Sequence, residues 1–329
     1  MTRAVRRVGV LGSFVWDRIY GRDLRSEPVE EWGGITYALG GMDAALCTPW
    51  QIVPIIKVGK DLEHRAREFL GTLRHVAAGA YPIAVDQPNN RVTLRYTEAE
   101  RRSEVLSGGV PPWTWLGLRP LLDDLDALYI NLISGFELDL LTAQLVRQHF
   151  HGPIFCDLHS LLLAVQPDGL RTPRPLPNAA EWMRCFDFVQ VNEAEMALMA
   201  SDSMALAAIA MNAGVQSLIV TLGSRGAVYF AAANFETLHD AHSARTRQRV
   251  DSALGTVRTA LLPAAATDVK EGDPTGCGDV FGATYFSRLL CGDKFADALQ
   301  LALRAAARNF AHRGATHLAF HLRGELGPS

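Results

Sequence analysis

The sequence has 329 residues, 48% of them hydrophobic and 20% charged, and carries a formal net charge of −3 at pH 7. This supply of apolar side chains can bury a large core, which excludes intrinsic disorder as the main state. The near balance of acidic and basic residues argues against a basic nucleic-acid-binding protein. Five cysteines occur, none of them in a C-x-x-C pair, and their odd number fits reduced thiols in a cytosolic enzyme better than a disulfide framework.

The start of the chain superficially resembles a signal peptide, because three arginines precede the apolar run Val8–Trp16. Gly12 and Ser13 interrupt this run and no small-residue cleavage site follows it, so we interpret it as a buried first strand. No stretch reaches the roughly 18 uninterrupted apolar residues of a membrane span. We therefore expect a soluble cytoplasmic protein that binds neither nucleic acid nor a membrane.

Short apolar runs alternate with helical patterns along most of the chain, which predicts a mainly parallel sheet covered by helices on both faces. Ligands bind such sheets at the carboxyl ends of the strands. The expected strands are Val8–Leu11, Ile52–Val58, Ala127–Ile133, Ile154–Leu158, Phe188–Val191 and Leu218–Thr221, and the expected helices include Leu62–Leu73, Glu137–Phe150 and Glu193–Met199.

Two segments break this alternation. Ile19–Trp32 is polar, and in Asn90–Gly109 the residues Val92, Leu94 and Tyr96 alternate with polar ones before a turn and a second short strand. These patterns predict strand-like pieces with one apolar face. Together the segments indicate a small β lid inserted into the α/β chain, with a pair of ordinary surface excursions as the alternative.

The stretch from Glu271 to Leu290 carries the most specific chemical signal, because a glycine-rich turn runs directly into an amphipathic helix. The small residues Gly276, Cys277 and Gly278 allow a ligand to approach backbone N–H groups that have no partner within the helix, and the helix dipole favours an anion there. Asp279 in the first turn could accept a proton from a hydroxyl that attacks phosphorus. Its alternative role is to stabilise the helix start.

The residues Asp273-Pro-Thr-Gly-Cys-Gly-Asp-Val-Phe281 resemble the C-terminal motif D-T-x-G-A-G-D-A-F of the PfkB, or ribokinase-like, sugar kinases. Further pieces resemble family motifs in the same order along the chain: Gly12 and Asp17, Trp32-Gly33-Gly34, Asn192-Glu-Ala-Glu195 and Val220-Thr-Leu-Gly-Ser-Arg-Gly226. The resemblance covers essentially the whole chain. It implies one ribokinase-like α/β/α domain over residues 1–329, with the lid formed by about 19–32 and 90–109.

The resemblance also implies roles for individual residues. Asp279 is the implied catalytic base, and the backbone of Gly276, Cys277 and Gly278 the implied anion hole. The implied substrate residues are Asp17, Gly33 and Gly34. Asn192 and Glu195 are implied to act on the magnesium and the phosphates, and Thr221, Gly223 and Gly226 to border ATP. Glu195 is implied to act on Mg²⁺ chiefly through water, since hard cations prefer oxygen ligands.

Structural alternatives stay open for several of these positions. Asn192 and Glu195 also fit a helix cap and a first-turn acid, and the glycines of 220–226 also fit a tight turn. Asp273 and the loop Arg313-Gly314-Ala315 resemble the family's monovalent-cation region, where an ion such as K⁺ would bind. The lid is implied to close over substrate and exclude water. We expect it to form a homodimer, which would cover the apolar face of Val92, Leu94 and Tyr96.

The chain departs from the family pattern at several places. In many family members the double glycine continues as G-G-x-x-x-N, with an asparagine that contacts the sugar. Counted from Gly33, this position is Ala38, and an alanine side chain cannot hydrogen-bond a sugar hydroxyl. Asp157 of the usual D-x-N-x-R is present, but the arginine is missing and His159 is nearby. Cys277 replaces the usual alanine. Its place at a helix start predicts a reactive thiolate, with a small, buried and inert side chain as the alternative.

Our interpretation is an ATP- and Mg²⁺-dependent kinase that transfers the γ-phosphoryl group to a hydroxyl of a sugar or sugar-like small molecule, with Asp279 as general base. One alternative is a nucleoside kinase, whose base pocket Phe14, Trp16, Tyr20 and Tyr37 would supply. The other is a nucleotide- or metabolite-binding sensor without catalysis.

Overall fold

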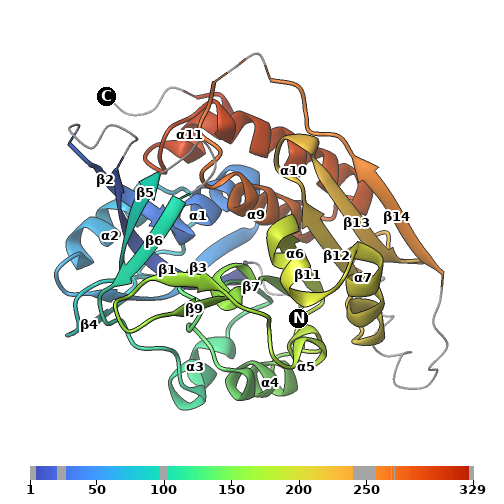
Figure 1. The fold of residues 1–329 in the computed structure, drawn as a ribbon, viewed down its shortest axis with the longest axis horizontal. Coiled ribbons are helices and arrows are strands. Elements are labelled where there is room, and N and C mark those ends of the chain that lie inside the picture. The colour runs from blue at the N-terminus through green and yellow to red at the C-terminus, as the bar shows by residue number, and fades with distance from the viewer. Residues whose placement is uncertain are drawn as a thin grey trace.

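The computed structural model describes residues 5–20, 27–96, 102–239, 256–267, 269 and 271–325. A central, mainly parallel sheet has helices on both faces (Figure 1). Its strand order is β14-β13-β12-β11-β8-β7-β1-β3-β4. The bounds are β1 Arg6–Tyr20, β3 Trp50–Gly59, β4 Ile83–Val85, β7 Ala127–Asn131, β8 Ile154–Asp157, β11 Phe188–Asn192, β12 Ser217–Thr221, β13 Ala227–Ala232 and β14 Val257–Leu262.

Two hydrophobic cores form on the two faces of this sheet. One lies under α1, α2, α9 and α10, and the other under α3, α4, α5 and α7. The helices are α1 Ile35–Ala45, α2 Glu63–Gly71, α3 Trp115–Leu122, α4 Leu140–His149, α5 Ala179–Met183, α6 Glu193–Met199, α7 Ser203–Asn212, α9 Cys277–Leu290, α10 Phe295–Phe310 and α11 Leu318–Arg323. Strands covered on both faces read as continuous apolar runs, which explains why every residue of β7 and of β8 is buried.

The strand β1 belongs to two layers. Its first half pairs with β3 and β7 in the central sheet, and its second half pairs with β2 (Val29–Gly34) and β5 (Arg91–Tyr96). The strand β6 (Arg102–Ser107) pairs with β5 and completes a small second layer beside the carboxyl edge of the central sheet (Figure 1). The predicted lid segments therefore lie together, with residues 21–26 and 97–101 outside the described part of the chain.

The apolar face of the lid is already covered within one chain. Val92 is 5% exposed and Leu94 is 4% exposed, and both belong to the core that also holds α1 and α9. The physical reason given for a homodimer, an uncovered Val92–Leu94 face, is therefore wrong, because this face packs inward. The homodimer itself stays a prediction.

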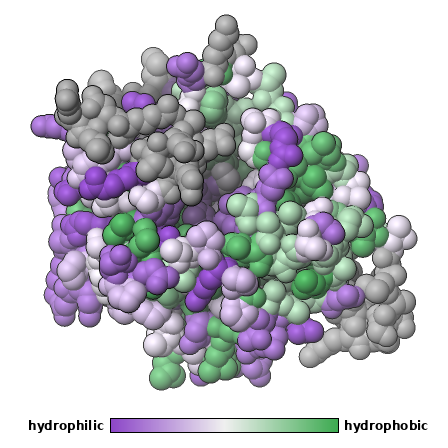
Figure 2. All heavy atoms as spheres, viewed as in Figure 1, coloured by the Kyte–Doolittle hydropathy of each residue, from purple (hydrophilic) through white to green (hydrophobic). Residues whose placement is uncertain are grey.

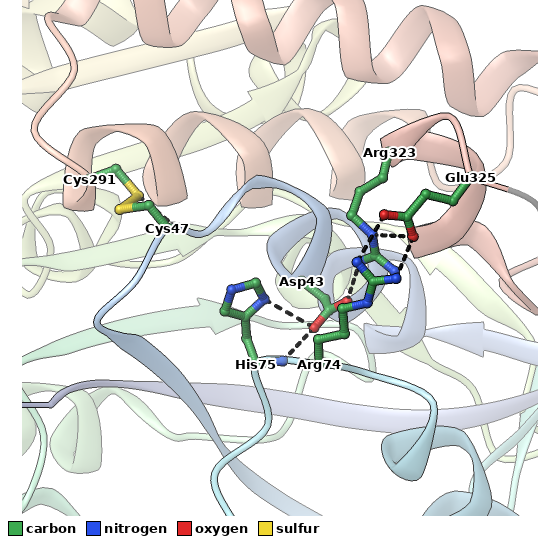
Figure 3. Close-up of polar contacts among 7 residues, drawn as sticks. All are labelled: Asp43, Cys47, Arg74, His75, Cys291, Arg323 and Glu325. Carbon is green, nitrogen blue, oxygen red and sulfur yellow. Dashed lines mark hydrogen bonds and ion pairs between the residues drawn. A yellow bond between two sulfur atoms is a disulfide. The ribbon is translucent and has the colours of Figure 1, made fainter.

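The far ends of α1 and α9 are joined covalently. Cys47 and Cys291 form a disulfide that closes 244 residues of chain, so the expectation of five reduced thiols is wrong for this pair (Figure 3). Sequence spacing cannot indicate such a bond, because the two residues meet only after both helices have packed. Cys156 and Cys185 are buried and free.

A buried ion network ties the C-terminal segment to α1 (Figure 3). The fully buried Asp43 accepts hydrogen bonds from the backbone N–H of His75 at 2.7 Å and from Nη1 of Arg323 at 2.6 Å. These bonds lower the pKa of Asp43 although burial opposes them. Arg323 also donates to Glu325, which in turn accepts two bonds from Arg74.

No single helix of the described residues is long and apolar enough to cross a membrane, and α6 and α7 meet that test only as a pair with a 69° bend.

Candidate active site

The N-terminus of α9 presents Asp279 at the carboxyl edge of the sheet. Gly276 adopts a left-handed conformation with φ of 75° just before the helix. A Cβ atom on Gly276 would lie 2.0 Å from Cδ1 of Tyr37, so only glycine allows the turn and the close packing at this point. Asp279 is 9% exposed, and its Oδ1 accepts a hydrogen bond of 2.6 Å from Nδ2 of Asn131 at the end of β7.

The protonation of Asp279 is set by opposing effects. Burial raises the pKa of Asp279, while the nearby imidazole of His159, the bond from Asn131 and a backbone N–H bond lower it. A raised pKa makes a carboxylate a better proton acceptor as long as it stays ionised at the working pH. The side chain therefore has the burial and the fixed orientation that a general base requires.

The thiol of Cys277 points away from the predicted anion hole and into the contact between α9 and α10. Its Sγ lies 3.3 Å from the donor Nδ2 of Asn309 and 3.4 Å from the carbonyl oxygen of Ala306. Burial raises the pKa of Cys277 to about 11. The predicted reactive thiolate is therefore wrong, because loss of water outweighs the helix dipole, and the half-buried Cys277 is closer to the small packed side chain of the alternative.

Of the three predicted anion-hole positions, Gly278 has the most open surroundings. The N–H of Cys277 is already used by the carbonyl oxygen of Pro274 at 3.2 Å. A Cβ on Gly278 would meet nothing closer than Nε2 of Gln190 at 3.8 Å, so there is space in front of the first turn of α9. Gln190 donates from the same atom to the carbonyl oxygen of Gly278 at 2.9 Å and to Asp157 at 2.7 Å. This amide links the ends of β8 and β11 to the start of α9.

Several acidic side chains lie near His159 at the carboxyl edge of the sheet. Burial raises the pKa of Asp157, and the neighbouring Glu195 and Asp279 raise it further. His159 has φ of 36°, a conformation that non-glycine residues rarely adopt. Its imidazole lies close enough to Asp279 and Glu195 to lower the pKa of both carboxyls. His159 is therefore a basic side chain placed beside these carboxyl groups.

Asn192 and Glu195 form a capping box at the start of α6. Oδ1 of Asn192 accepts from the N–H of Glu195 at 2.9 Å, and Oε2 of Glu195 accepts from the N–H of Asn192 at 2.8 Å. The structural alternative for this pair is thus present. It does not exclude a role toward phosphates, since Asn192 stands beside Thr221 in the parallel register of β11 and β12.

The predicted nucleotide loop follows β12. Gly223 has φ of 58° and a Cβ there would meet nothing within 4 Å, which leaves room for a ligand to approach. Gly226 has φ of 98°, and a Cβ would lie 2.0 Å from the carbonyl oxygen of Leu262. Gly226 is therefore required by the turn itself. Figure 2 shows a hollow between the lid strands and the region of α6 on this face of the molecule.

The predicted substrate residues lie together where β1 leaves the central sheet. Asp17 is 8% exposed, and a Cβ on Gly33 would lie 1.8 Å from its Oδ2. Gly33 thus allows the strand β2 to pass directly against the Asp17 carboxyl. Gly34 has φ of 60°, and a Cβ there would lie 2.8 Å from the carbonyl oxygen of Ser13. Asp17, Gly33 and Gly34 therefore form one group beside the lid.

The aromatic residues considered for a nucleoside pocket do not gather around one space. Phe14 is 1% exposed and packs on Trp32 and Phe69. Trp16 lies under the guanidinium of Arg65, and Tyr20 under that of Arg95.

Two residues of α1, Tyr37 and Ala38, are also buried. Tyr37 is 3% exposed and packs against Gly276. Burial and the surrounding carboxyls raise the pKa of Tyr37. Ala38 is fully buried, so it contacts no substrate.

The predicted monovalent-cation region gathers as a second small group. Oδ1 of Asp273 accepts from the N–H of Thr275 at 2.9 Å. A Cβ on Gly314 would lie 2.1 Å from Oε2 of Glu31, a residue of the lid strand β2. Burial and the charge of Asp273 raise the pKa of Glu31. The role of Asp273 toward a cation stays a prediction.

Residues 165–320 match the family model of the pfkB family carbohydrate kinases. This C-terminal part of the chain is therefore similar to that family. The nucleoside kinase of Burkholderia thailandensis in complex with inosine is similar in structure, with TM-score 0.70, 16% identity and coverage of 95% of this chain and 94% of that one.

Ribokinase from Thermotoga maritima matches with TM-score 0.66 and 17% identity over 97% of this chain and 98% of its own. A pyrophosphate-dependent kinase in the ribokinase family, complexed with a pyrophosphate analog and myo-inositol, matches with TM-score 0.69 and 14% identity over 93% and 96%. A comparison with curated protein sequences gives no significant match. The ribokinase-like α/β fold is thereby confirmed, and the family-model match over residues 165–320 supports the phosphotransferase class.

Kinases of this family use ATP, generally with Mg²⁺. Within the described residues no group of three or more His, Cys, Asp or Glu side chains stands close enough to hold a metal ion. Both carboxylate oxygens of Glu195 are engaged by Asn192, at 2.8 and 2.7 Å. The arrangement therefore fits an Mg²⁺ that is held by phosphate oxygens and water, with Glu195 in contact through water.

Three side chains of the candidate site were not found by the sequence analysis. Asn131 holds Asp279, Gln190 joins β11 to α9, and Arg171 lies buried beside the lid. Each comes from a strand far from the C-terminal motif and belongs to no motif of its own. The only available signal was the place of Asn131 and Gln190 in or at the end of a predicted parallel strand.

Proposed function

We propose that the chain transfers the γ-phosphoryl group of ATP to a hydroxyl of a sugar or sugar-like small molecule, with Asp279 as general base. The observation that supports this most directly is the buried Asp279 carboxylate, held by Asn131 at the glycine-rich start of α9. Asp17 and Asp279 are both close enough to Tyr37 to raise its pKa.

The chemistry needs little from the protein beyond position and charge. Asp17 accepts hydrogen bonds from substrate hydroxyls and fixes the sugar. Asp279 takes the proton from the attacking hydroxyl as its oxygen bonds to phosphorus, and the bond to the leaving phosphate of ADP breaks. Backbone N–H groups of Gly276 and Gly278 stabilise the charge on the transferring phosphoryl group. When bound, Mg²⁺ neutralises the charge of the phosphates.

A nucleoside acceptor is the second candidate, because the structural relatives include a nucleoside kinase that binds inosine. The positions of the aromatic residues weigh against it. Phe14 is in the core and offers no ring face to a base, and one face of Trp16 is occupied by Arg65. A substrate panel of sugars, cyclitols and nucleosides separates the two candidates.

The test of the base is Asp279→Asn. We expect kcat to fall by about 10²–10⁴-fold, while ADP still raises the melting temperature. The matched control is Asp202→Asn, since Asp202 caps α7 through the N–H of Ala205 and asparagine caps a helix equally well. Near-normal turnover by Asp279→Asn would remove Asp279 as the base. Assays with ATP and with pyrophosphate identify the donor, and turnover with pyrophosphate alone would contradict the ATP assignment.

A further inference from the structure

A buried arginine lies at the junction between the lid and the body of the molecule. Arg171 is 9% exposed and opens the short strand β10 (Arg171–Pro173), which pairs with β9 (Leu163–Val165). This hairpin docks on the lid, because the N–H of Leu106 in β6 donates to the carbonyl oxygen of Gly169 at 2.8 Å. A Cβ on Gly169 would lie 2.3 Å from the backbone carbonyl oxygen of Leu106. The hairpin and the lid strand are therefore in direct backbone contact.

The guanidinium of Arg171 uses only part of its donor capacity within the described residues. Nη2 donates to the carbonyl oxygen of Ile133 at 3.1 Å and Nη1 to Oγ of Ser160 at 3.3 Å. Glu104 in β6 lies 3.6 Å from Nη1. Nε is buried and makes no hydrogen bond to any residue that the structure describes. A buried polar group without a partner is unfavourable, so a ligand that supplies an acceptor to Nε gains by it.

The position of Arg171 places this donor beside the substrate residues. Ile133 and Ser160 follow β7 and β8 at the carboxyl edge of the sheet, where ligands of parallel sheets bind. Ile133 also adjoins the double glycine, since a Cβ on Gly34 would lie 2.9 Å from its Cγ2. Asp17 is close enough to raise the pKa of Arg171.

We propose that Arg171 is a specificity-determining substrate residue, whose Nε donates a hydrogen bond to an oxygen of a neutral polyhydroxylated substrate while Asp17 accepts from its hydroxyls. This inference rests on the proposed function and deepens it. The charges around Arg171 decide for a neutral substrate. Its neighbours Glu104, Glu137 and Asp17 are carboxyl groups, so one guanidinium faces three acids. A substrate carboxylate would add a fourth negative charge to this space.

The experiment compares Arg171→Met with Arg174→Met, which removes an exposed arginine three residues further along. Kinetics are measured with neutral sugars and cyclitols, with sugar acids and with nucleosides. We expect the unsubstituted chain to prefer a neutral polyol. Arg171→Met should raise KM for that substrate roughly 10–100-fold with kcat within a few-fold, because hydrogen bonds to charged groups contribute about 1.5–3 kcal/mol. Arg174→Met should leave both constants unchanged.

Monodeoxy analogues of the preferred substrate give a readout that a merely structural role would not move. One deoxy position should raise KM for the unsubstituted chain but cost nothing further in Arg171→Met, since the partner is already gone. Equal losses in both proteins at every position would overturn the contact. If Arg171→Met does not fold, as ADP-dependent melting would show, Arg171→Lys keeps the charge but lacks Nε. It should lose discrimination at the same hydroxyl, and retained discrimination would overturn the proposal.

The outcomes also separate this inference from the proposed function. Normal phosphorylation of a neutral polyol by Arg171→Met would end the role of Arg171 and leave the kinase assignment intact. A preference for sugar acids or nucleosides would refute the charge argument. No turnover of any acceptor by the unsubstituted chain would overturn the proposed function, and this inference with it.

Discussion

The hydrogen bond from Asn131 to Asp279 offers a direct test of how the site sets its base. The bond is 2.6 Å long and buried, and it favours the ionised carboxylate. Its removal in Asn131→Ala should raise the pKa of Asp279. A hydrogen bond to a charged group contributes about 1.5–3 kcal/mol, and one pKa unit corresponds to about 1.36 kcal/mol. The expected shift is therefore roughly one to two units upward.

The assay is the pH dependence of kcat/KM, whose acid limb reports the base in the free enzyme. Burial already raises the pKa of Asp279 from 3.8, so the limb of the unsubstituted chain lies above that value. In Asn131→Ala the limb moves further up, and activity is lost at mildly acidic pH while the alkaline plateau is less affected. Thr284→Val is the matched control, since Thr284 is buried on the same helix and its Oγ1 has no hydrogen-bond partner among the described residues.

The shape of the profile decides the outcome. An acid limb that does not move, with activity lowered equally at every pH, would refute the reasoning. It would show that Asn131 only packs against α9, or that Asp279 is not the titrating base. A limb that moves downward would also contradict it, because loss of a donor to a carboxylate cannot favour ionisation.

Two further predictions concern stability. Asp43→Asn breaks a buried ion pair and should lower the free energy of unfolding by about 3–5 kcal/mol at pH 7. The pKa of Asp43 in the folded state is lowered from 3.8, so its contribution to stability is present above that pH and is lost as the pH falls. The free energy of urea unfolding should therefore change less between neutral pH and pH 3 in Asp43→Asn than in the unsubstituted chain. Cys47→Ser removes the disulfide to Cys291 and should lower the free energy of unfolding by about 2–4 kcal/mol. Dithiothreitol should lower the melting temperature of the unsubstituted chain but not that of Cys47→Ser. An equal shift in both proteins would contradict a formed disulfide.

Most strands and the C-terminal motif could be predicted from the sequence because their signals are local. The apolar runs at 127–133, 154–158 and 188–191 correspond to β7, β8 and β11, and the expected helix Glu193–Met199 has the bounds of α6. The strand β1 was underestimated. It continues to Tyr20 through Asp17 and Arg18, which an apolar-run criterion excludes, because this half pairs in the lid rather than in the core.

The rest depends on contacts between distant segments. Asn131 and Asp279 are 148 residues apart, and no local pattern records that they meet. The same holds for Arg171, which reaches Ile133 across 38 residues. The prediction for Cys277 failed for a different reason: the helix start was identified correctly, but the direction of the thiol toward Asn309 and Ala306 depends on how α10 packs.

The division of the site between two supports has a functional consequence. Asp279 is carried by α9, which packs along α1 and is joined to its far end by the Cys47–Cys291 disulfide. Arg171 instead adjoins the lid, through Glu104 and the backbone of β6. A carboxylate that stands on a packed helix and is fixed by Asn131 of β7 is preorganised, whereas contacts made through a lid depend on its closure. Substitutions at Asn131 should therefore act on the pH dependence of turnover, and substitutions at Arg171 on KM and substrate choice. A variant at Arg171 that shifted the acid limb without changing KM would contradict this division.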